Sequence, residues 1–322
     1  MAILTPLLLD DARRLGARYG LDVAAVRGIP AGSVNSNFAL TLVGGGQAFL
    51  RVYEEQGAAS ASVEARMLAH LAERGVKTPR PVSLAGDAAG GFIAEHAGKP
   101  VAVFPWIEGD SLCQKLVTRA AVWKLGAALA QVHLAGDSFV GAAPSRFGAP
   151  QLALRLRTLT AMDLDAELAA LVARLSDRLV ELTDRPRAGE GLIHGDLFRD
   201  NVLWHEGEIT SLLDFESASL GSRPFDLMVT ILAWCFGDGL DHELVRALAD
   251  GYTSARPLPE DEAAALYVEG SFAALRFTIT RITDFELRPR GNGVFKDYRR
   301  FLARGAALAE LGPLGLRALI GV

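Results

Sequence analysis

Residues 192–201 read LIHGDLFRDN, and this stretch decides the fold together with residues 212–216, which read LLDFE. Within the first stretch, Asn201 follows Asp196 by five residues. Between the two stretches lie two short apolar runs separated by Glu-Gly-Glu, a pattern that predicts a β-hairpin. Because a hairpin brings its two ends together, we expect Asn201, at the start of the first strand, to lie near Asp214, at the end of the second.

An amide and two carboxylates in this arrangement are the groups that phosphoryl transfer needs. One carboxylate orients the acceptor hydroxyl and takes its proton, while the amide oxygen and the other carboxylate hold magnesium against the nucleotide phosphates. The Asp-to-Asn spacing and the later Asp-Phe pair match the protein-kinase signature. We therefore predict Asp196 as the catalytic base and Asn201 and Asp214 as Mg²⁺ ligands, with a nucleotide as the phosphate donor. A lone His-Gly-Asp triplet would indicate only a turn, so the prediction depends on the whole constellation.

Two further residues are expected to support this segment. His194 is expected to bond to the backbone as a scaffold rather than to act as the base. Asp226 lies in the run Arg-Pro-Phe-Asp that opens a helix, so it either caps that helix or braces the catalytic segment by accepting backbone hydrogen bonds. In both cases its predicted role is structural support of Asp196.

Outside this segment, the chain is rich in strand signals before residue 105 and in helix signals after it. The first part predicts a helix, a hairpin with three glycines at its tip, a second helix and two more strands, at 7–20, 38–43, 48–53, 62–74, 91–95 and 100–106. The second part predicts, besides the 201–214 hairpin, helices near 118–135, 151–160, 163–183, 223–236, 241–254, 260–287 and 295–311. This order predicts an α+β, protein-kinase-like two-lobed fold, with a small antiparallel β-rich N-lobe (1–105) and a mostly helical C-lobe (106–322).

The composition points to a protein that handles small molecules. Of 322 residues, 33 are basic and 38 acidic, for a net charge of −5, whereas nucleic-acid binding favours a basic face and a high pI. Cys113 and Cys235 are too far apart for a CxxC motif and too few for a disulfide framework. There is no basic leader and no uninterrupted apolar span, so we expect a cytoplasmic protein without a membrane partner. The sequence carries no signal for an oligomeric state.

The string His-Gly-Asp-Leu at 194–197, followed by Asn201, resembles the catalytic string of the aminoglycoside phosphotransferase and choline kinase superfamily, His-Gly-Asp-Leu-x-x-x-Asn. The resemblance extends over essentially the whole chain. It implies an ATP-dependent kinase with a β-rich small lobe and a helical large lobe. No G-x-x-x-x-G-K-[ST] string occurs, so the sequence does not support a P-loop kinase.

The candidates for nucleotide binding lie in the first third of the chain. Protein kinases hold the α- and β-phosphates with a strand Lys that pairs with a helical Glu. Here Arg51 and Glu64 occupy these places, and the Arg is a departure from the commoner Lys; ordinary ion pairing is the alternative. Small and polar residues before the first hairpin suit contacts to phosphate, with a plain turn as the alternative. The apolar segment 104–107 suits a hinge facing adenine, with core packing as the alternative. The further candidates are therefore Gly32, Ser33, Asn35, Phe104, Trp106 and Ile107.

Four further strings resemble bacterial type II homoserine kinases and occur in the same order. They are VNSNF at 34–38, AWCF at 233–236, ALRF at 274–277 with Thr280, Arg281 and Asp284, and KDY at 296–298. This resemblance implies that the acceptor is L-homoserine, in a step of threonine biosynthesis. The chain departs from the family pattern at Leu232, where members carry Asn, at Glu216, where they tend to have aromatic residues, and at Arg51.

The charge pattern of the last helices favours an acceptor with a carboxylate. Between residues 276 and 304, eight basic side chains face three acidic ones, whereas a polycationic aminoglycoside would need an acidic pocket. Arg276 and Asp284 share a helical face, so they are candidates for the carboxylate and ammonium groups of homoserine; a solvated face with internal ion pairs is the alternative. Trp234 would suit a choline ammonium or, alternatively, the core. The candidate acceptor residues are Glu216, Trp234, Arg276, Arg281 and Asp284.

Two other functions stay open at this stage. A kinase of the same fold would act on another small alcohol, such as choline, a sugar or an aminoglycoside. A pseudokinase would bind nucleotide without transferring phosphate. Arg51 leaves room for a pseudokinase, whereas the joint presence of Asp196, Asn201 and Asp214 argues against it.

Overall fold

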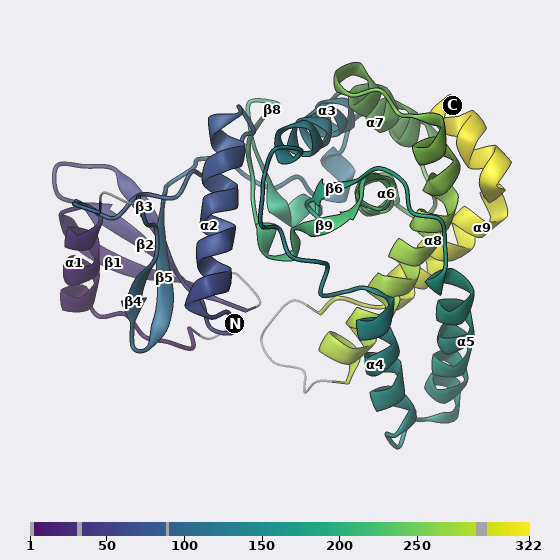
Figure 1. The fold of residues 1–322 in the computed structure, drawn as a ribbon, viewed down its shortest axis with the longest axis horizontal. Helices are drawn as coiled ribbons and strands as arrows, with labels where there is room; N and C mark the ends of the chain where they lie inside the picture. Colours follow the sequence, from purple (N-terminus) through teal and green to yellow (C-terminus); the bar gives the residue numbers. More distant parts are fainter. Residues whose placement is uncertain (1–2, 31–33, 88–89, 288–294) are drawn as a thin grey trace. The chain divides into compact units, whose positions relative to one another are not determined.

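The computed structural model describes residues 3–30, 34–87, 90–287 and 295–322. These residues form two compact units (Figure 1). The first contains the described residues up to Gly109 together with Thr210–Leu213, and the second contains the remaining described residues from Asp110 onward. None of the helices in these ranges has both the length and the apolar character of a membrane-spanning segment. Four residues considered from the sequence lie outside the described ranges: the loop residues Gly32 and Ser33, and two of the eight basic residues between 276 and 304, Arg288 and Arg290.

The first unit is built on an antiparallel sheet of five strands in the order β1-β2-β3-β5-β4. Its elements are α1 (Leu9–Arg18), β1 (Val23–Ile29), β2 (Ser36–Leu42), β3 (Gln47–Val52), α2 (Ala58–Glu73), β4 (Ala94–His96) and β5 (Lys99–Pro105). The predicted hairpin is confirmed, since β2 pairs with β3 and the three glycines at its tip all have positive φ, which glycine adopts without steric cost. Strand β1 was not predicted, because its Ala and Gly residues have little strand propensity.

The core of the first unit covers one face of this sheet. Alternate side chains of β2 and β3, such as Phe38 and Leu50, are buried together with side chains of β5 and α1. Successive strand residues point to opposite faces, so this alternation assigns one face of the sheet to the core. The hydroxyl of Tyr19, at the end of α1, donates to the carbonyl oxygen of Val101 at 2.8 Å and ties the helix to β5. This packing holds β3, the strand that carries Arg51, in the middle of the sheet.

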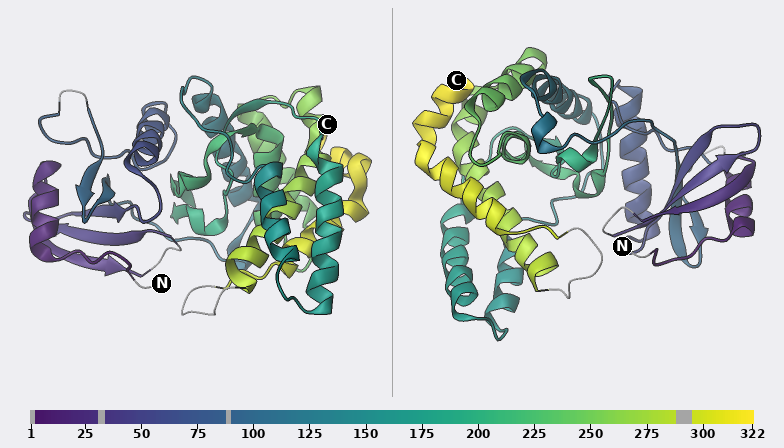
Figure 2. Two further views of the ribbon diagram at one scale, coloured as in Figure 1. Left: turned by 60° about the horizontal axis from the view of Figure 1, so that its bottom comes forward. Right: turned by 180° about the vertical axis from the view of Figure 1, so that it is seen from behind.

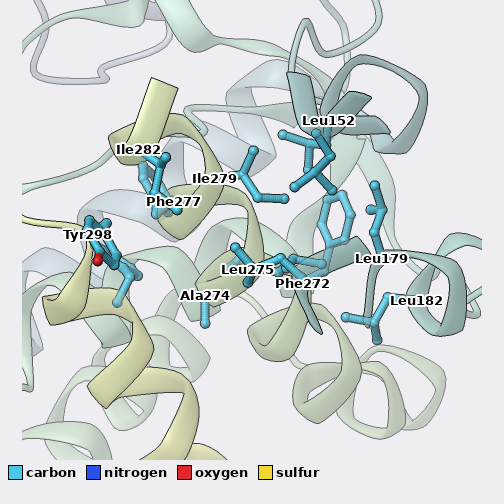
Figure 3. Close-up of a cluster of buried hydrophobic side chains, with 14 of the residues drawn as sticks. Leu152, Leu179, Leu182, Phe272, Ala274, Leu275, Phe277, Ile279, Ile282 and Tyr298 are labelled. Atoms are coloured by element: carbon cyan, nitrogen blue, oxygen red, sulfur yellow. The ribbon is translucent and has the colours of Figure 1, made fainter. Parts of the chain in front are cut away.

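The second unit is mainly helical. Its helices are α3 (Arg119–Gly136), α4 (Ala149–Thr160), α5 (Ala166–Thr183), α6 (Arg223–Trp234), α7 (His242–Ala255), α8 (Glu260–Arg281) and α9 (Arg299–Ile320). Helices α4, α5, α6 and α9 all pack against α8, and Figure 2 shows α9 running along it. Figure 3 shows Phe272 and Leu275 of α8 in one cluster with Leu152 of α4 and Leu179 of α5. All the predicted helices are present, and α9 continues past its expected end through a kink at Gly312.

Helices α3 and α7 approach closely because each presents a glycine to the other. A Cβ at Gly126 of α3 would lie 2.1 Å from the carbonyl oxygen of Leu248, and one at Gly251 of α7 would lie 1.9 Å from the carbonyl oxygen of Trp123. Packed interiors do not accommodate atoms at such distances, so the helix contact requires both glycines. The contact fixes the position of α3, which carries the buried His133.

Two short sheets flank the 194–201 loop along the chain. Strand β6 (Glu190–Ile193) pairs with β9 (Ser219–Ser222), and β7 (Val202–His205) forms a hairpin with β8 (Glu208–Leu212). The β7–β8 hairpin was predicted and is confirmed. Strands β6 and β9 were missed because each has only four residues and its partner is distant in sequence. The 194–201 loop therefore runs from the end of β6 to the start of β7.

Candidate active site

A buried carboxylate, Asp226, supports the start of the 194–201 loop. Its two oxygens accept hydrogen bonds from the backbone N–H groups of His194 and Gly195, each at 2.7 Å. Asp226 lies in the first turn of α6, whose N-cap is Ser222, so it braces the loop and does not cap the helix. Burial by itself raises the pKa of Asp226, but the hydrogen bond with His133, nearby charges and the loop N–H groups bring it below its ordinary value. The ionised acceptor makes these loop bonds strong.

A histidine that the sequence analysis missed completes this support. His133 is fully buried in α3, with Nε2 3.0 Å from Asp226 Oδ2 and Nδ1 2.8 Å from the hydroxyl of Tyr252. Burial lowers the pKa of His133, although the neighbouring Asp226 acts in the opposite direction. The Tyr252 hydroxyl also accepts a hydrogen bond from Arg256, which forms a two-bond ion pair with Glu262. The available sequence signal was a polar residue on the buried face of an apolar helix.

The backbone of the loop depends on Gly195, which has a left-handed φ of 78°. A Cβ there would lie 2.9 Å from the carbonyl oxygen of Ser217, so the position admits only glycine. Farther along, Asn201 donates from Nδ2 to the carbonyl oxygen of Asp196 at 2.8 Å. The amide nitrogen of Asn201 is thereby committed to the loop, which leaves its amide oxygen as the atom that could bind a cation.

Trp234, predicted as an acceptor contact, supports the loop instead. It has no exposed surface, and its Nε1 donates to the carbonyl oxygen of Leu197 at 2.9 Å. Its ring packs against Trp204 of β7 with the ring centroids 6.1 Å apart. A side chain without exposed surface does not contact an acceptor, so the prediction of a substrate role was wrong and the alternative of a core tryptophan is correct. Its buried N–H needs an acceptor, which the loop supplies.

Asp196 is the partly exposed carboxylate of the loop, with 24% of its side chain accessible. Arg276 of α8 lies beside it, with Nη1 3.5 Å from Asp196 Oδ1. Burial raises the pKa of Asp196 above its ordinary value, and Asp214 acts in the same direction, while Arg276 and Lys296 oppose the shift. A higher proton affinity makes a carboxylate a better general base as long as it remains ionised.

Asp214 occupies the turn after β8 and has a strained backbone. Its φ of 60° and ψ of 61° are left-handed, which is uncommon for a residue other than glycine. Its Oδ1 is buried and has no hydrogen-bond partner among the described residues. Such an oxygen is costly unless a cation or a donor binds it. The side chain of Asp214 therefore fits a metal ligand.

Asn201 and Asp214 offer an amide oxygen and a carboxylate, which are oxygen donors of the kind that Mg²⁺ prefers. Mg²⁺ prefers oxygen ligands and is usually held by one or two carboxylates, substrate phosphates and water. In the part of the chain that the structure describes, no group of three or more His, Cys, Asp or Glu side chains could hold a metal. One amide oxygen and one carboxylate form a partial donor set, of the kind that Mg²⁺ completes with phosphate oxygens and water.

Arg276 and Asp284, predicted to bind one amino acid together, have different partners. Asp284 forms an ion pair with Arg155 of α4 at 2.6 Å, and Arg155 also donates to Thr283. Arg276 faces Asp196 instead. The two side chains diverge because Asp284 lies in a π-helical turn, Ile282–Glu286, where the regular α-helical spacing of α8 no longer holds.

Other basic residues of the 276–304 stretch have partners within the chain. Arg281 and Arg304 each donate to a backbone carbonyl oxygen, at 2.9 and 2.6 Å respectively. Lys296 pairs with Asp200 at 3.6 Å. Glu216 is half-buried in the short 3₁₀ turn that follows Asp214. Much of the basic excess therefore has a structural use, and Arg276 is the predicted acceptor residue that lies beside Asp196.

In the first unit, Arg51 and Glu64 form the ion pair that the sequence suggested. Arg51 Nη1 lies 3.6 Å from Glu64 Oε1, and both side chains are largely buried. Glu64 also accepts a hydrogen bond from the hydroxyl of Tyr53 at 3.3 Å. The Arg51 guanidinium lies near the rings of Phe49 and Tyr53, at 5.8 and 6.0 Å from their centroids. The pair is thus held in a fixed position on the middle strand of the sheet.

The remaining nucleotide candidates lie at the ends of strands. Asn35 precedes β2, and its side-chain oxygen accepts a hydrogen bond from the backbone N–H of Glu54 at 3.1 Å. Phe104 is buried near the end of β5, and Trp106 and Ile107 are half-buried in the segment that follows. The three apolar residues are therefore positioned by the strand that pairs with β3.

A known protein-family model matches the part of the chain that holds most of these residues. Residues 25–258 match the model of the "Phosphotransferase enzyme family". The chain belongs to this family. The match includes the 194–201 loop, Asp214 and Asp226, as well as the Arg51–Glu64 pair. It therefore spans the loop, the turn after β8 and the first unit's sheet, the parts of the structure that carry the predicted chemistry.

Relatives of this phosphotransferase are similar over nearly their whole length. A homoserine kinase from Methylocella silvestris is 36% identical over 304 residues, which cover 90% of each chain. A homoserine kinase from Gluconacetobacter diazotrophicus is 34% identical over 331 residues, which cover 98% of this chain and 100% of the relative. The prediction of a homoserine kinase-like member of the aminoglycoside phosphotransferase superfamily is thereby confirmed, and the chain is a small-molecule kinase.

Solved structures of other phosphotransferases share the fold. An amicoumacin kinase in complex with AMP-PNP and Ca²⁺ matches with a TM-score of 0.69 at 16% identity, covering 97% of this chain and 93% of its own. A spectinomycin phosphotransferase in complex with ADP and spectinomycin matches with a TM-score of 0.66 at 16% identity, covering 99% of both. Together with the antiparallel sheet and the helical second unit, these matches confirm the predicted kinase-like fold.

Proposed function

We propose that this phosphotransferase transfers the γ-phosphate of ATP to the hydroxyl group of L-homoserine. The observation that supports this acceptor most is the similarity, at 33–36% identity over 89–100% of the relatives' length, to proteins named homoserine kinase. The departure from the family pattern at Leu232 does not oppose the proposal. Leu232 is fully buried, and its backbone carbonyl accepts a hydrogen bond from Arg304.

In the proposed reaction Asp196 binds the acceptor hydroxyl and takes its proton. The hydroxyl oxygen forms a bond to the γ-phosphorus while the bond from that phosphorus to the β–γ bridging oxygen breaks, so ADP leaves. Burial raises the pKa of Asp196, which improves it as a proton acceptor. The bonds from His194 and Gly195 to Asp226 hold the loop that positions Asp196, and positioning of this kind is a large part of catalysis in phosphoryl transfer.

Asn201 and Asp214 would hold Mg²⁺ in this reaction. At this place Mg²⁺ would supply positive charge against the charge that develops on the phosphoryl group. The buried Oδ1 of Asp214, which has no hydrogen-bond partner in the described part of the chain, supports its role as a ligand. The left-handed backbone of Asp214 supports it as well, because strained residues persist mainly where function requires them.

We assign nucleotide binding to the first unit. Arg51, held by Glu64, would bind the α- and β-phosphates, and its permanent charge and planar fork suit phosphate oxygens. Backbone groups around Phe104, Trp106 and Ile107 would face adenine. We place the reaction in the cytoplasm, where a reducing environment keeps thiols such as Cys113 and Cys235 free, as both are in the structure.

Charge around Asp196 favours homoserine over the alternative acceptors. Arg276, Lys296 and Arg281 all act electrostatically on Asp196, which suits a carboxylate-bearing acceptor and opposes a polycationic aminoglycoside. A choline acceptor would need aromatic side chains around its ammonium group. Trp234, the aromatic residue considered for that role, is entirely buried.

The test is ADP release in a coupled optical assay with MgATP and a panel of acceptors. The panel contains L-homoserine, L-threonine, choline, a thioribose and an aminoglycoside. Saturable turnover of L-homoserine alone is the expected result. Turnover of another member in its place would refute the proposed acceptor but keep the phosphotransferase, and binding of MgATP without any turnover would favour a pseudokinase.

A pair of variants tests the proposed base. Asp196→Asn is expected to lower kcat at least about 100-fold, the contribution typical of general acid–base catalysis. Asp200→Asn is the matched control, because Asp200 is an exposed carboxylate of the same loop. It should leave kcat close to that of the wild type. Equal kcat values for Asp196→Asn and the wild type would exclude Asp196 as the base.

A further inference from the structure

Arg276 of α8 is a buried cation with unused hydrogen-bond donors. Its side chain is only 4% exposed. The guanidinium carbon lies 3.7 Å from the ring centroid of Phe277 and 4.1 Å from that of Phe147. Aromatic rings attract the cation through their faces but satisfy none of its N–H donors. Nε and Nη1 are both buried and have no hydrogen-bond partner among the described residues.

Such a guanidinium is costly unless an anion binds it. Burial lowers the pKa of Arg276 to about 10, although Asp196 acts in the opposite direction. Asp196 itself is 3.5 Å away, longer than the roughly 2.7–2.9 Å of a charge-assisted hydrogen bond. Arg146 and Arg155 add like charge nearby. Arg155 is itself paired with Asp284, so the like charge that acts on Arg276 comes mainly from Arg146.

Other buried arginines of the second unit have found acceptors. Arg185 donates to Glu269 at 2.8 Å, and Arg256 forms two bonds of 2.6 Å with Glu262. In those cases a carboxylate neutralises the charge and accepts the donors, so the arginine serves the fold. Arg276 differs from them because its Nε and Nη1 have no hydrogen-bond partner among the residues that the structure describes, although it lies beside the proposed catalytic base.

We propose that Arg276 binds the carboxylate of the acceptor and is the residue that selects acidic acceptors. This inference rests on the proposed function, because it takes Asp196 as the group that binds the acceptor hydroxyl. The 3.5 Å between Arg276 Nη1 and Asp196 Oδ1 then limits the acceptor to a molecule with its hydroxyl close to its carboxylate. L-homoserine carries the two groups at the ends of a short aliphatic chain, at most about 5 Å apart at ordinary bond lengths.

The rings of Phe147 and Phe277 give the guanidinium a fixed position. Phe147 lies just before α4, and Phe277 is next to Arg276 on α8. Because aromatic contacts restrict the long Arg side chain, little rotamer entropy remains to be lost when a carboxylate binds. Phe147 is a further residue of the proposed acceptor site that the sequence analysis did not identify.

The test compares two acceptors that differ in the carboxylate alone, L-homoserine and its decarboxylated form, 3-aminopropan-1-ol. Steady-state ADP release is measured with MgATP for the wild type and for Arg276→Met, which removes the charge but keeps an unbranched side chain that packs against aromatic rings. For Arg276→Met we expect kcat/KM to fall about 10- to 100-fold with L-homoserine, the range expected for hydrogen bonds to a charged group. With 3-aminopropan-1-ol kcat/KM should fall less, because that loss reports only the effect of Arg276 on the pKa of Asp196, which both acceptors share.

Two further variants complete the test. Arg276→Lys keeps the charge without the planar fork, so it should recover part of the kcat/KM for L-homoserine. Arg157→Met is the matched control, because Arg157 is an exposed arginine on α4. It should leave the kinetics of both acceptors unchanged. MgATP binding and the thermal melting temperature of each variant show whether it is folded.

Three results would contradict the inference or its premise, and they are distinct. Equal losses with both acceptors in Arg276→Met would show that Arg276 acts through Asp196 or the phosphoryl group and not on the acceptor carboxylate. Equal kcat/KM values of the wild type for both acceptors would also overturn the inference, and this result needs no variant. A wild type that phosphorylates neither acceptor would overturn the proposed function itself.

Discussion

Asp226→Asn tests whether the buried carboxylate sets the position of the 194–201 loop. In the wild type, the two oxygens of Asp226 accept hydrogen bonds from the backbone N–H groups of His194 and Gly195, and His133 Nε2 lies 3.0 Å from Oδ2. In asparagine one of these oxygens becomes an NH₂ group, which is a donor. Whichever way the amide is turned, that donor faces a backbone N–H. One loop N–H therefore loses its acceptor, and the other keeps only a neutral one.

The size of the effect follows from these bonds. Hydrogen bonds to charged groups contribute about 1.5–3 kcal/mol, and a buried donor without a partner costs about 1–3 kcal/mol. We therefore expect the free energy of unfolding of Asp226→Asn to fall by about 3 kcal/mol. Because Asp196 directly follows His194 and Gly195, whose N–H groups are disturbed, we also expect kcat to fall about 100-fold, as a displacement of about 1 Å can do. The KM for ATP should stay the same.

Urea unfolding followed by circular dichroism and steady-state kinetics measure the two effects. Asp137→Asn is the control, because Asp137 is a carboxylate with 52% of its side chain exposed that pairs with Arg223. Its loss should cost less than about 1 kcal/mol, as for other exposed pairs. A variant Asp226→Asn that unfolds at the wild-type urea concentration and keeps the wild-type kcat would show that these buried bonds do not position the loop.

Three further predictions concern the metal, the helix packing and the response to pH. Asp214→Asn should weaken Mg²⁺-dependent nucleotide binding more than about 100-fold. Asparagine tolerates the left-handed backbone of this position, so the variant tests the carboxylate alone. If nucleotide binding depended on the Mg²⁺ concentration as in the wild type, the ligand role would be excluded. Gly251→Ala should lower the free energy of unfolding by about 3 kcal/mol, measured in urea, because the new Cβ would lie 1.9 Å from a carbonyl oxygen. Gly237→Ala is the control and should leave the free energy of unfolding nearly unchanged, because no described atom would lie within 4 Å of its Cβ. Burial lowers the pKa of His133 in the folded protein. Below about pH 6.5 the unfolded chain therefore binds more protons at this residue than the folded chain does, so the free energy of unfolding should fall as the pH drops through that value. His133→Gln should lose less stability than the wild type between about pH 7.5 and 5.5, and parallel losses would contradict this cause.

The chemistry of the site was readable from the sequence because it depends on short spacings. Asp196 and Asn201 are five residues apart, and the hairpin that follows them has a local turn signal. Local patterns of this kind also predicted the β2–β3 hairpin and the helices of the second unit, since turn residues and apolar periodicity act within a few residues. The Arg51–Glu64 pair was suggested in the same way, from a strand followed by a helix.

The tertiary structure decided what distant residues do to this loop. Trp234 was considered as an acceptor contact, but folding buries it against Leu197. His133 is recognisable locally only as a polar residue in an apolar helix, and nothing local connects it to Asp226, 93 residues later in the chain. Short strands such as β6 and β9 were missed for the same reason, because pairing rather than propensity makes them strands.

The same division holds for the acceptor site. Helical spacing placed Arg276 and Asp284 on one face, but the π-helical turn and the ion pair with Arg155 separate their roles. The sequence shows which side chains are basic and how they repeat along a helix. The partner of each guanidinium depends on contacts between elements that are far apart in the chain, and only the packed structure sets those contacts. These contacts decide whether an arginine pairs with a carboxylate, donates to a carbonyl oxygen or, like Arg276 beside Asp196, keeps donors without a partner among the described residues.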